Sequence, residues 1–285
     1  MKWFLNYHWG AKSLVSLYLS IVSGVILAFQ YDYIEPYYSS GTLELITPYG
    51  SFWRSLHFYS SQAFFLFFLI HLVVVVIDRE ISLSGEGGRG SNPAEGAWLR
   101  LALSLPVAVL LLFSGYILRA DATGESAGHI AENIILAVPV LGDWLNYLLF
   151  RISEVGLRVV YVNHLAGFIL FWGYLCWNHL RKYRVSLKDH LLFTGIVLAV
   201  SAILTAPLEP FQPGAFQING PWFFIGLQEL LRHLQPLPAG ILFPSLGMIA
   251  LVGCIYRERD SLMSGFVLIS WVFLYVGLSV VGFLR

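Results

Sequence analysis

The stretch from Phe52 to Ile77, FWRSLHFYSSQAFFLFFLIHLVVVVI, decides the fold of this chain. Crossing the hydrocarbon core of a bilayer takes about 20 apolar residues in a helix, and this stretch is long enough. Its charged residue, Arg54, lies near its start, where a long side chain can reach the membrane surface. Two histidines, His57 and His71, interrupt the apolar run. The stretch therefore predicts a membrane-spanning helix that carries two ionisable rings.

The composition of the whole chain agrees with a membrane protein. Hydrophobic residues make up 57% of the 285 residues, charged residues make up 12%, and the mean hydropathy is +0.70. Soluble domains contain about 25% charged residues. The formal net charge is zero, so no basic surface indicates nucleic-acid binding. An all-α integral membrane fold in contact with lipid is the expectation.

Apolar runs and helix breakers predict about seven transmembrane helices. Their expected ranges are 12–30, 52–77, 98–118, 159–180, 190–207, 237–256 and 262–283. A basic stretch at 181–188 separates the fourth from the fifth. We therefore expect a four-helix diheme module over residues 1–185 and a three-helix C-terminal module over 186–285. The long connection between the third and fourth spans contains two candidate surface helices, at 124–137 and 143–151.

The basic residues near the ends of the spans predict the orientation of the chain. With the N-terminus in the cytoplasm, eleven of the 17 Lys and Arg residues lie on that side, and six lie outside. An excess of Lys and Arg in the cytoplasmic loops of membrane proteins favours this arrangement. The expected location is a multi-pass position in an energy-transducing membrane, with a prokaryotic plasma membrane favoured.

Four histidines fall within the predicted spans, where ionisable side chains usually mark functional sites. His57 and His71 are 14 residues apart on the second span, and His164 and His179 are 15 apart on the fourth. In an ideal α-helix these steps return to within about 40° and about 60° of the same face. The members of each pair then stand about 21 Å apart along the helix axis. Because both helices start on the same side, His57 faces His164, and His71 faces His179.

Two imidazoles on opposite sides of one iron are typical of haems that transfer electrons, since no open coordination position is needed. The four histidines therefore predict two non-covalent b-type haems. Glycines suit positions where a helix backbone approaches a flat ring. Gly10 and Gly24 repeat the 14-residue step on the first helix, and Gly115 lies on the third. Arg54, one turn before His57, is either a partner of a haem propionate or an anchor at the membrane surface.

Two other interpretations of the histidines stay open. Histidines can join helices by hydrogen bonds in a bundle without any cofactor. A transporter without haem is a further alternative, although carboxylates are nearly absent from the predicted spans.

With these residues in place, the chain resembles the cytochrome b family of bc-type quinol-oxidising complexes. The similarity is carried by Arg54-Ser55-Leu56-His57 with His71, Gly24-Val25-Ile26-Leu27-Ala28, and Ser114-Gly115-Tyr116-Ile117-Leu118. The 15-residue step of the fourth helix and Ala137-Val138-Pro139-Val140-Leu141-Gly142 resemble the plastid-type cytochrome b-six branch. Leu208-Glu209-Pro210 resembles the three-helix subunit that accompanies that branch, here fused to it.

The resemblance implies a quinone-reactive subunit of a respiratory oxidoreductase complex. Such a subunit oxidises quinol at the outer side, passes one electron to a Rieske protein or a c-type cytochrome, and is often dimeric. The other electron crosses the membrane through the two haems to an inner quinone site. This chain departs from the family pattern at Arg119-Ala120, where the family has Pro-Trp, and at Trp222, where it has a proton-accepting glutamate.

Other groups must therefore accept protons if quinol is oxidised at the outer side. The candidates in the two long outer connections are Asp121, Glu125, His129, Glu132, Glu229 and His233. Candidates for an inner quinone site are Lys12, Asp78, Arg79, Lys182 and His190. The alternative is a diheme anchor and electron conduit that serves an outer redox partner without a quinol site of its own.

Overall fold

The computed structural model describes residues 7–84, 95–209, 220–254 and 259–285, and every regular element among them is a helix. The chain forms two compact units. The first comprises Met1–Pro93 and Cys176–Leu208, and the second comprises Ala94–Leu175 and Glu209–Arg285. Each unit therefore combines segments from both sides of residue 185. The predicted modules 1–185 and 186–285 stay a prediction about the chain's organisation.

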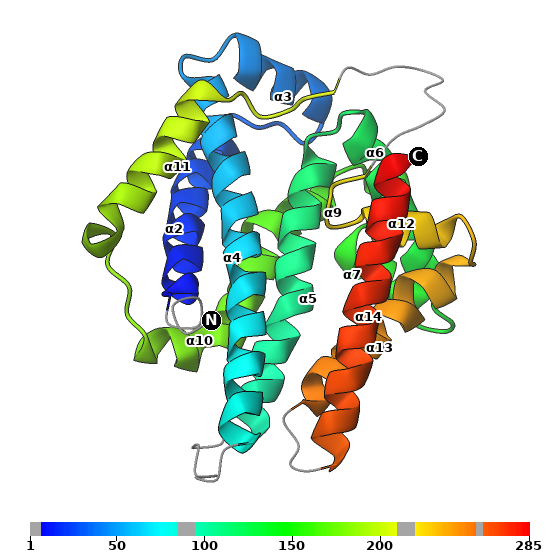
Figure 1. Ribbon diagram of the computed structural model, residues 1–285. Helices are drawn as coiled ribbons and strands as arrows, with labels where there is room; N and C mark the ends of the chain where they lie inside the picture. The colour runs from blue at the N-terminus through cyan, green and yellow to red at the C-terminus, as the bar shows by residue number, and fades with distance from the viewer. Residues whose placement is uncertain (1–6, 85–94, 210–219, 255–258) are drawn as a thin grey trace. The chain divides into compact units, whose positions relative to one another are not determined.

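In the first unit, two long helices lie side by side (Figure 1). These are α2, Trp9–Ala28, and α4, Gly50–Ser84. Buried serines on α2 let the backbones approach, and the Ser13 hydroxyl donates to the carbonyl of Phe64 on α4 at 3.0 Å. This unit also contains α3, Pro36–Leu45, which packs on α4, and the last part of α10, Phe168–Lys182, from Cys176 onward. The helix α11, Leu191–Ile203, follows the short η2, Leu187–His190, and packs on both long helices.

The second unit is built around α5, Glu95–Leu118, which contacts α6, α9 and α13. The short helices between the third and fourth spans are α6, Ala122–Leu136, α7, Gly142–Leu149, and α8, Ile152–Val155. The C-terminal helices are α12, Ile225–Leu231, η3, Pro238–Leu242, α13, Phe243–Gly253, and α14, Arg259–Leu284. Both predicted short helices of the connection are confirmed by α6 and α7.

The fourth span is one helical run with an irregular turn. It consists of α9, Arg158–Val162, the π turn η1, Asn163–Gly167, and α10, Phe168–Lys182. The N–H of Phe168 donates to the carbonyl of Asn163, five residues earlier. A π turn holds one residue more than an α turn, and such turns are frequent at functional sites.

Among the described residues, five helices are long and apolar enough to cross a membrane: Trp9–Ala28, Gly50–Ile77, Gly96–Leu118, Arg158–Lys182 and Met263–Leu284. They confirm five of the seven predicted spans. The other two regions are helical but shorter than expected, as α11 over Leu191–Ile203 and the apolar run Pro238–Gly253. The helix α11 ends where the backbone becomes extended at Leu204, three residues before Pro207, and a proline shortly after a helix cannot continue it. The protein is an all-helical, multi-pass membrane protein.

Candidate haem-binding site

The structure brings His71 and His179 together within the first unit. Their ring centroids are 6.1 Å apart, and the ring planes are inclined by 48°. A metal–imidazole bond is about 2 Å long and a ring nitrogen lies about 1 Å from its centroid, so two imidazoles on opposite sides of one ion have centroids about 6 Å apart. The observed spacing therefore fits an iron held between the two rings.

Glycines lie directly against the rings of three of the four histidines. A Cβ atom added at Gly10 would lie 3.1 Å from Nε2 of His71, and one at Gly24 would lie 2.8 Å from Cε1 of His57. Both contacts are between α2 and α4. In the second unit, a Cβ at Gly115 would lie 3.2 Å from Cε1 of His164. Side chains at these positions would crowd the rings, which explains why glycine is needed there.

The ring of His57 is oriented by the backbone of α2. Its Nδ1 lies 2.9 Å from the carbonyl oxygen of Ser20. A carbonyl only accepts hydrogen bonds, so the proton lies on Nδ1 and the lone pair lies on Nε2. This is the tautomer that binds a metal through Nε2, with the other nitrogen held by a carbonyl.

His164 lies inside the π turn η1, and its Nδ1 is 2.9 Å from Oγ of Ser114. The π turn also changes the spacing argument made from the sequence. Because it takes up one extra residue, the 15-residue step from His164 to His179 corresponds to about 14 residues of regular helix, as on α4. His57 and His164 belong to different units, and their pairing stays a prediction from the sequence.

Arg54 has partners other than those expected. Its Nε donates to Glu44 of α3 at 2.6 Å, Nη1 donates to the carbonyl of Pro207 at 3.2 Å, and Nη2 donates to the carbonyl of Ala206. The side chain is only 11% exposed. The guanidinium thus ties α3 and the connection after α11 to α4, and its contact with a propionate stays a prediction.

Asp121, a predicted proton acceptor, is completely buried and holds the turn between α5 and α6. Its carboxylate caps α6 by accepting from the N–H of Gly124 at 3.0 Å and pairs with Arg119. It also accepts from the N–H of Glu209 at 3.0 Å. These bonds occupy the carboxylate in structural roles.

Glu132 is likewise buried and joins α6 to the segments that follow. It accepts from Nδ2 of Asn146 at 3.0 Å and from the N–H of Ser153 at 3.1 Å. Burial alone would raise the pKa of this carboxyl, but the hydrogen bonds from Ser153 and Asn146 outweigh it and hold the pKa below its ordinary value. Glu132 is therefore ionised at neutral pH.

Glu229, on α12, is buried among cationic groups of α12 and the end of the chain. Its carboxylate lies 2.8 Å from Nη1 of Arg285, 3.1 Å from Nε2 of His233 and 3.3 Å from Nη1 of Arg232. The two other predicted groups, Glu125 and His129, are exposed on α6. His129 is 4.0 Å from Glu132.

The candidates for an inner site lie near the ends of the helices. Lys12 stacks its ammonium over the ring of Tyr7 at 3.6 Å. Lys182 is exposed at the end of α10, and His190 precedes α11. The side chains of Asp78 and Arg79 lie outside the described part of the structure.

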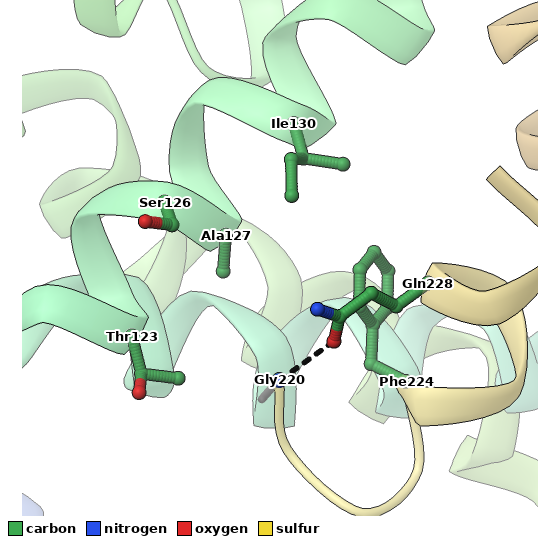
Figure 2. Close-up of a pocket in the computed structure, with 7 residues that line it drawn as sticks. All are labelled: Thr123, Ser126, Ala127, Ile130, Gly220, Phe224 and Gln228. Carbon is green, nitrogen blue, oxygen red and sulfur yellow. Dashed lines mark hydrogen bonds between the residues drawn. The ribbon is translucent and has the colours of Figure 1, made fainter. Parts of the chain in front are cut away.

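Sequence reasoning missed a small pocket in the second unit (Figure 2). Its lining surrounds about 210 Å³ of space, part of it open to solvent, between α6 and residues 220–228. Its described lining residues are Thr123, Ser126, Ala127, Ile130, Gly220, Phe224 and Gln228. Oε1 of Gln228 accepts from the N–H of Gly220 at 2.7 Å. No ionisable side chain is among these described lining residues. The sequence could not predict the pocket, because it lies between segments about 100 residues apart.

The chain is a multi-pass membrane protein whose spans bring histidine rings against glycines. Comparison with known proteins identifies its family. The family model described as "Cytochrome b/b6/petB" matches residues 2–182. The chain therefore belongs to the cytochrome b/b6 family, as the resemblance indicated.

Curated relatives are similar over about half of the chain. Cytochrome b6 of Prochlorococcus marinus (strain NATL1A) is 26% identical over 149 residues, which are 52% of this chain and 64% of that protein. Cytochrome b6 of Heliobacterium modesticaldum is 26% identical over 161 residues, 54% and 71% of the two chains. The cytochrome bc1 complex cytochrome b subunit of Corynebacterium diphtheriae is 24% identical over 192 residues, 57% of this chain and 34% of that one.

The fold is similar to that of a solved chain described as "Hyperthermophilic respiratory Complex III". The TM-score is 0.60, the identity is 15%, and the match covers 98% of this chain and 91% of that chain. At this identity the likeness concerns the fold alone. It extends over the C-terminal helices, which the family model does not cover.

Proposed function

We propose that the chain transfers electrons across the membrane through two non-covalent b haems, as the quinone-reactive subunit of an oxidoreductase complex. His71 with His179 would hold one haem and His57 with His164 the other. The observation that carries this proposal is the 6.1 Å separation of the His71 and His179 rings, which suits one iron between them. Family membership supports b haems as the cofactor.

The chain's own residues would position each haem edge and exclude water. The Ser20 carbonyl keeps the His57 proton on Nδ1, so that Nε2 is the coordinating atom. Gly10, Gly24 and Gly115 keep side chains away from the rings. A bound haem supplies one-electron redox chemistry. Because the histidines of α4 stand about 21 Å apart along the axis, the two haems would occupy two levels of the membrane.

We propose the pocket between α6 and residues 220–228 as the place for quinol. It adjoins Pro221-Trp222, where the resemblance puts the family's proton-accepting glutamate. The amide of Gln228 and the hydroxyl of Ser126 offer hydrogen bonds to quinone oxygens, whereas the Thr123 hydroxyl donates its proton to Glu209 and can only accept from a quinol. The carboxylates of Asp121, Glu132 and Glu229 lie against other groups of the fold and are not among the described lining residues of this pocket.

A second candidate function is a diheme conduit without a quinol site of its own. Two observations favour it: the described pocket lining has no acid or base, and the pocket has room for about one water molecule, about 10 Å³, far below the about 300 Å³ at which ligand pockets begin. Electrons would then pass between the His57–His164 haem and an outer redox protein.

The remaining parts of the proposal concern the assembly. We infer that residues 186–285 are a fused counterpart of the three-helix partner subunit, because the fold similarity continues through them. The N-terminus would be cytoplasmic, and a Rieske protein or c-type cytochrome would bind on the outer side. The relative that is named as a subunit of a cytochrome bc1 complex supports a place in such a complex, and we propose that the complex is dimeric.

Rapid-mixing reduction by quinol tests the function. The oxidised, purified protein is mixed with a short-chain quinol, and haem absorption is followed. A rate that saturates with quinol supports the quinone-reactive subunit. Haems that accept electrons from dithionite but not from quinol would contradict it and support the conduit.

The pocket has a matched pair of variants on α6. Ser126→Leu fills the pocket, whereas Asn133→Leu adds the same side chain at an exposed position of the same helix. We expect quinol-dependent reduction to slow at least about tenfold in Ser126→Leu and to stay normal in Asn133→Leu. Equal rates in both variants would show that quinol reacts elsewhere.

A further inference from the structure

Ser114 is a buried serine of α5 that contacts a predicted haem ligand. Its side chain is completely enclosed, and its Oγ lies 2.9 Å from Nδ1 of His164. The same Oγ donates to the carbonyl of Leu111 at 3.0 Å. A hydroxyl has one proton, and here it goes to Leu111. Oγ therefore accepts a hydrogen bond from Nδ1–H of His164, and the lone pair of that ring lies on Nε2.

His164 lies at an irregular point of its helix, so its ring orientation depends on the contact with Ser114. The residue lies in the π turn η1, where regular i to i+4 hydrogen bonding is interrupted. The ring of His57, in contrast, is on a regular helix and is held by a backbone carbonyl. For His164 the acceptor is a side chain, which a single substitution can remove.

We propose that Ser114 is a positioning residue of His164, and that it tunes the redox potential of the haem that His164 would hold. The inference rests on the proposed function. A ligand imidazole that donates its second N–H becomes a stronger electron donor. A stronger donor stabilises the oxidised iron and lowers the potential. Donation by the Ser114 hydroxyl to Leu111 polarises its oxygen and strengthens this effect.

A competing interpretation is that Ser114 only satisfies its own hydroxyl within the helix. Ser104 provides the comparison, because it lies on the same helix, is equally buried, and donates to the carbonyl of Leu101 at 2.6 Å. The two serines make the same backbone bond. They differ in the contact that Ser114 makes with His164.

Potentiometric titration of the two haems in three variants tests the proposal. For Ser114→Ala we expect the potential of one haem to rise, with a changed low-spin ferric signal in electron paramagnetic resonance, while the other haem is unaffected. Ser114→Thr keeps a hydroxyl and should restore the native potential. Ser104→Ala should leave both potentials unchanged.

The outcomes separate this inference from the proposed function. Absence of haem from the unmodified protein would overturn the proposed function itself. Two bound haems with unchanged potentials in Ser114→Ala, or an equal shift in Ser104→Ala, would overturn the role of Ser114 alone. Where Ser114→Ala does not accumulate, Ser114→Cys replaces it, since a thiol is a weak acceptor and should shift the potential in the same direction.

Discussion

Along α2 and α4 histidine rings lie against glycines, whereas around α6 and α12 carboxylates lie against hydrogen-bond donors. His57 and His71 face positions without side chains, and the proton of His57 is fixed on the nitrogen that would not bind iron. The carboxylates of Asp121 and Glu132 accept hydrogen bonds from N–H and hydroxyl groups. The first region is the one that we propose for haem binding, and in the second region the carboxylates connect segments of the fold.

The largest expected effect is the loss of a haem when one of the four predicted haem-binding histidines is replaced. His71→Ala or His179→Ala should each remove the same one of the two haems, and His57→Ala or His164→Ala should each remove the other. Visible spectra with haem quantification measure this. His8→Ala, an exposed residue before α2, should keep both haems. Loss of both haems from every one of the four variants would count against the pairing.

A methyl group at Gly24 should have a smaller but specific effect. Gly24→Ala places a carbon 2.8 Å from Cε1 of His57, so the ring must move. We expect the affinity for the His57–His164 haem to fall about tenfold or more. Gly195→Ala on α11, where an added Cβ meets nothing within 4 Å, is the control for haem content. A Gly24→Ala protein with native haem spectra would contradict the proposed role of the glycine.

In the acidic region the expected change is in stability. Asp121→Ala leaves Arg119 unpaired and α6 without its cap, and should lower the free energy of unfolding by about 3 kcal/mol. Thermal unfolding in detergent measures this, with exposed Glu125→Ala expected within about 0.5 kcal/mol of the native protein. An Asp121→Asn protein of native stability that had lost quinol oxidation would instead assign the carboxylate to catalysis.

Glu132 gives the smallest effect, which depends on pH. The pKa of Glu132 is lower in the folded protein than in the unfolded chain. Its contribution to the free energy of unfolding is therefore complete above the pKa of an unfolded carboxyl group, about 4.3, and is lost as the pH falls through the folded pKa. Each hydrogen bond contributes about 1 kcal/mol. The melting temperature of the native protein should exceed that of Glu132→Gln at pH 7 and approach it under acid conditions. A difference independent of pH would be inconsistent with this explanation.

The helices and the histidine pairs could be predicted because they depend on short-range regularities. Apolar runs located five long spans within a few residues, and the 14-residue step on α4 put His57 and His71 on one helix. The π turn at Asn163–Gly167 could not be predicted, since an ideal 100° step per residue was assumed. It explains why a 15-residue step between His164 and His179 is compatible with a 14-residue step on α4.

Contacts between residues far apart in the sequence could not be predicted. Arg54 binds backbone carbonyls about 150 residues away, and Asp121 binds the N–H of Glu209. Neither contact leaves a pattern in the local sequence. The same holds for Ser114 and His164, which are 50 residues apart. The buried carboxylates of the outer connection have structural partners that the sequence did not predict, and their role as proton acceptors stays a prediction.

The most direct test of the account is a pyridine-haemochrome assay combined with a potentiometric titration of the visible spectrum of the purified protein. We predict two non-covalent b haems per chain that titrate as separate components. A colourless protein would contradict the account, and a single haem would contradict one of the two histidine pairs.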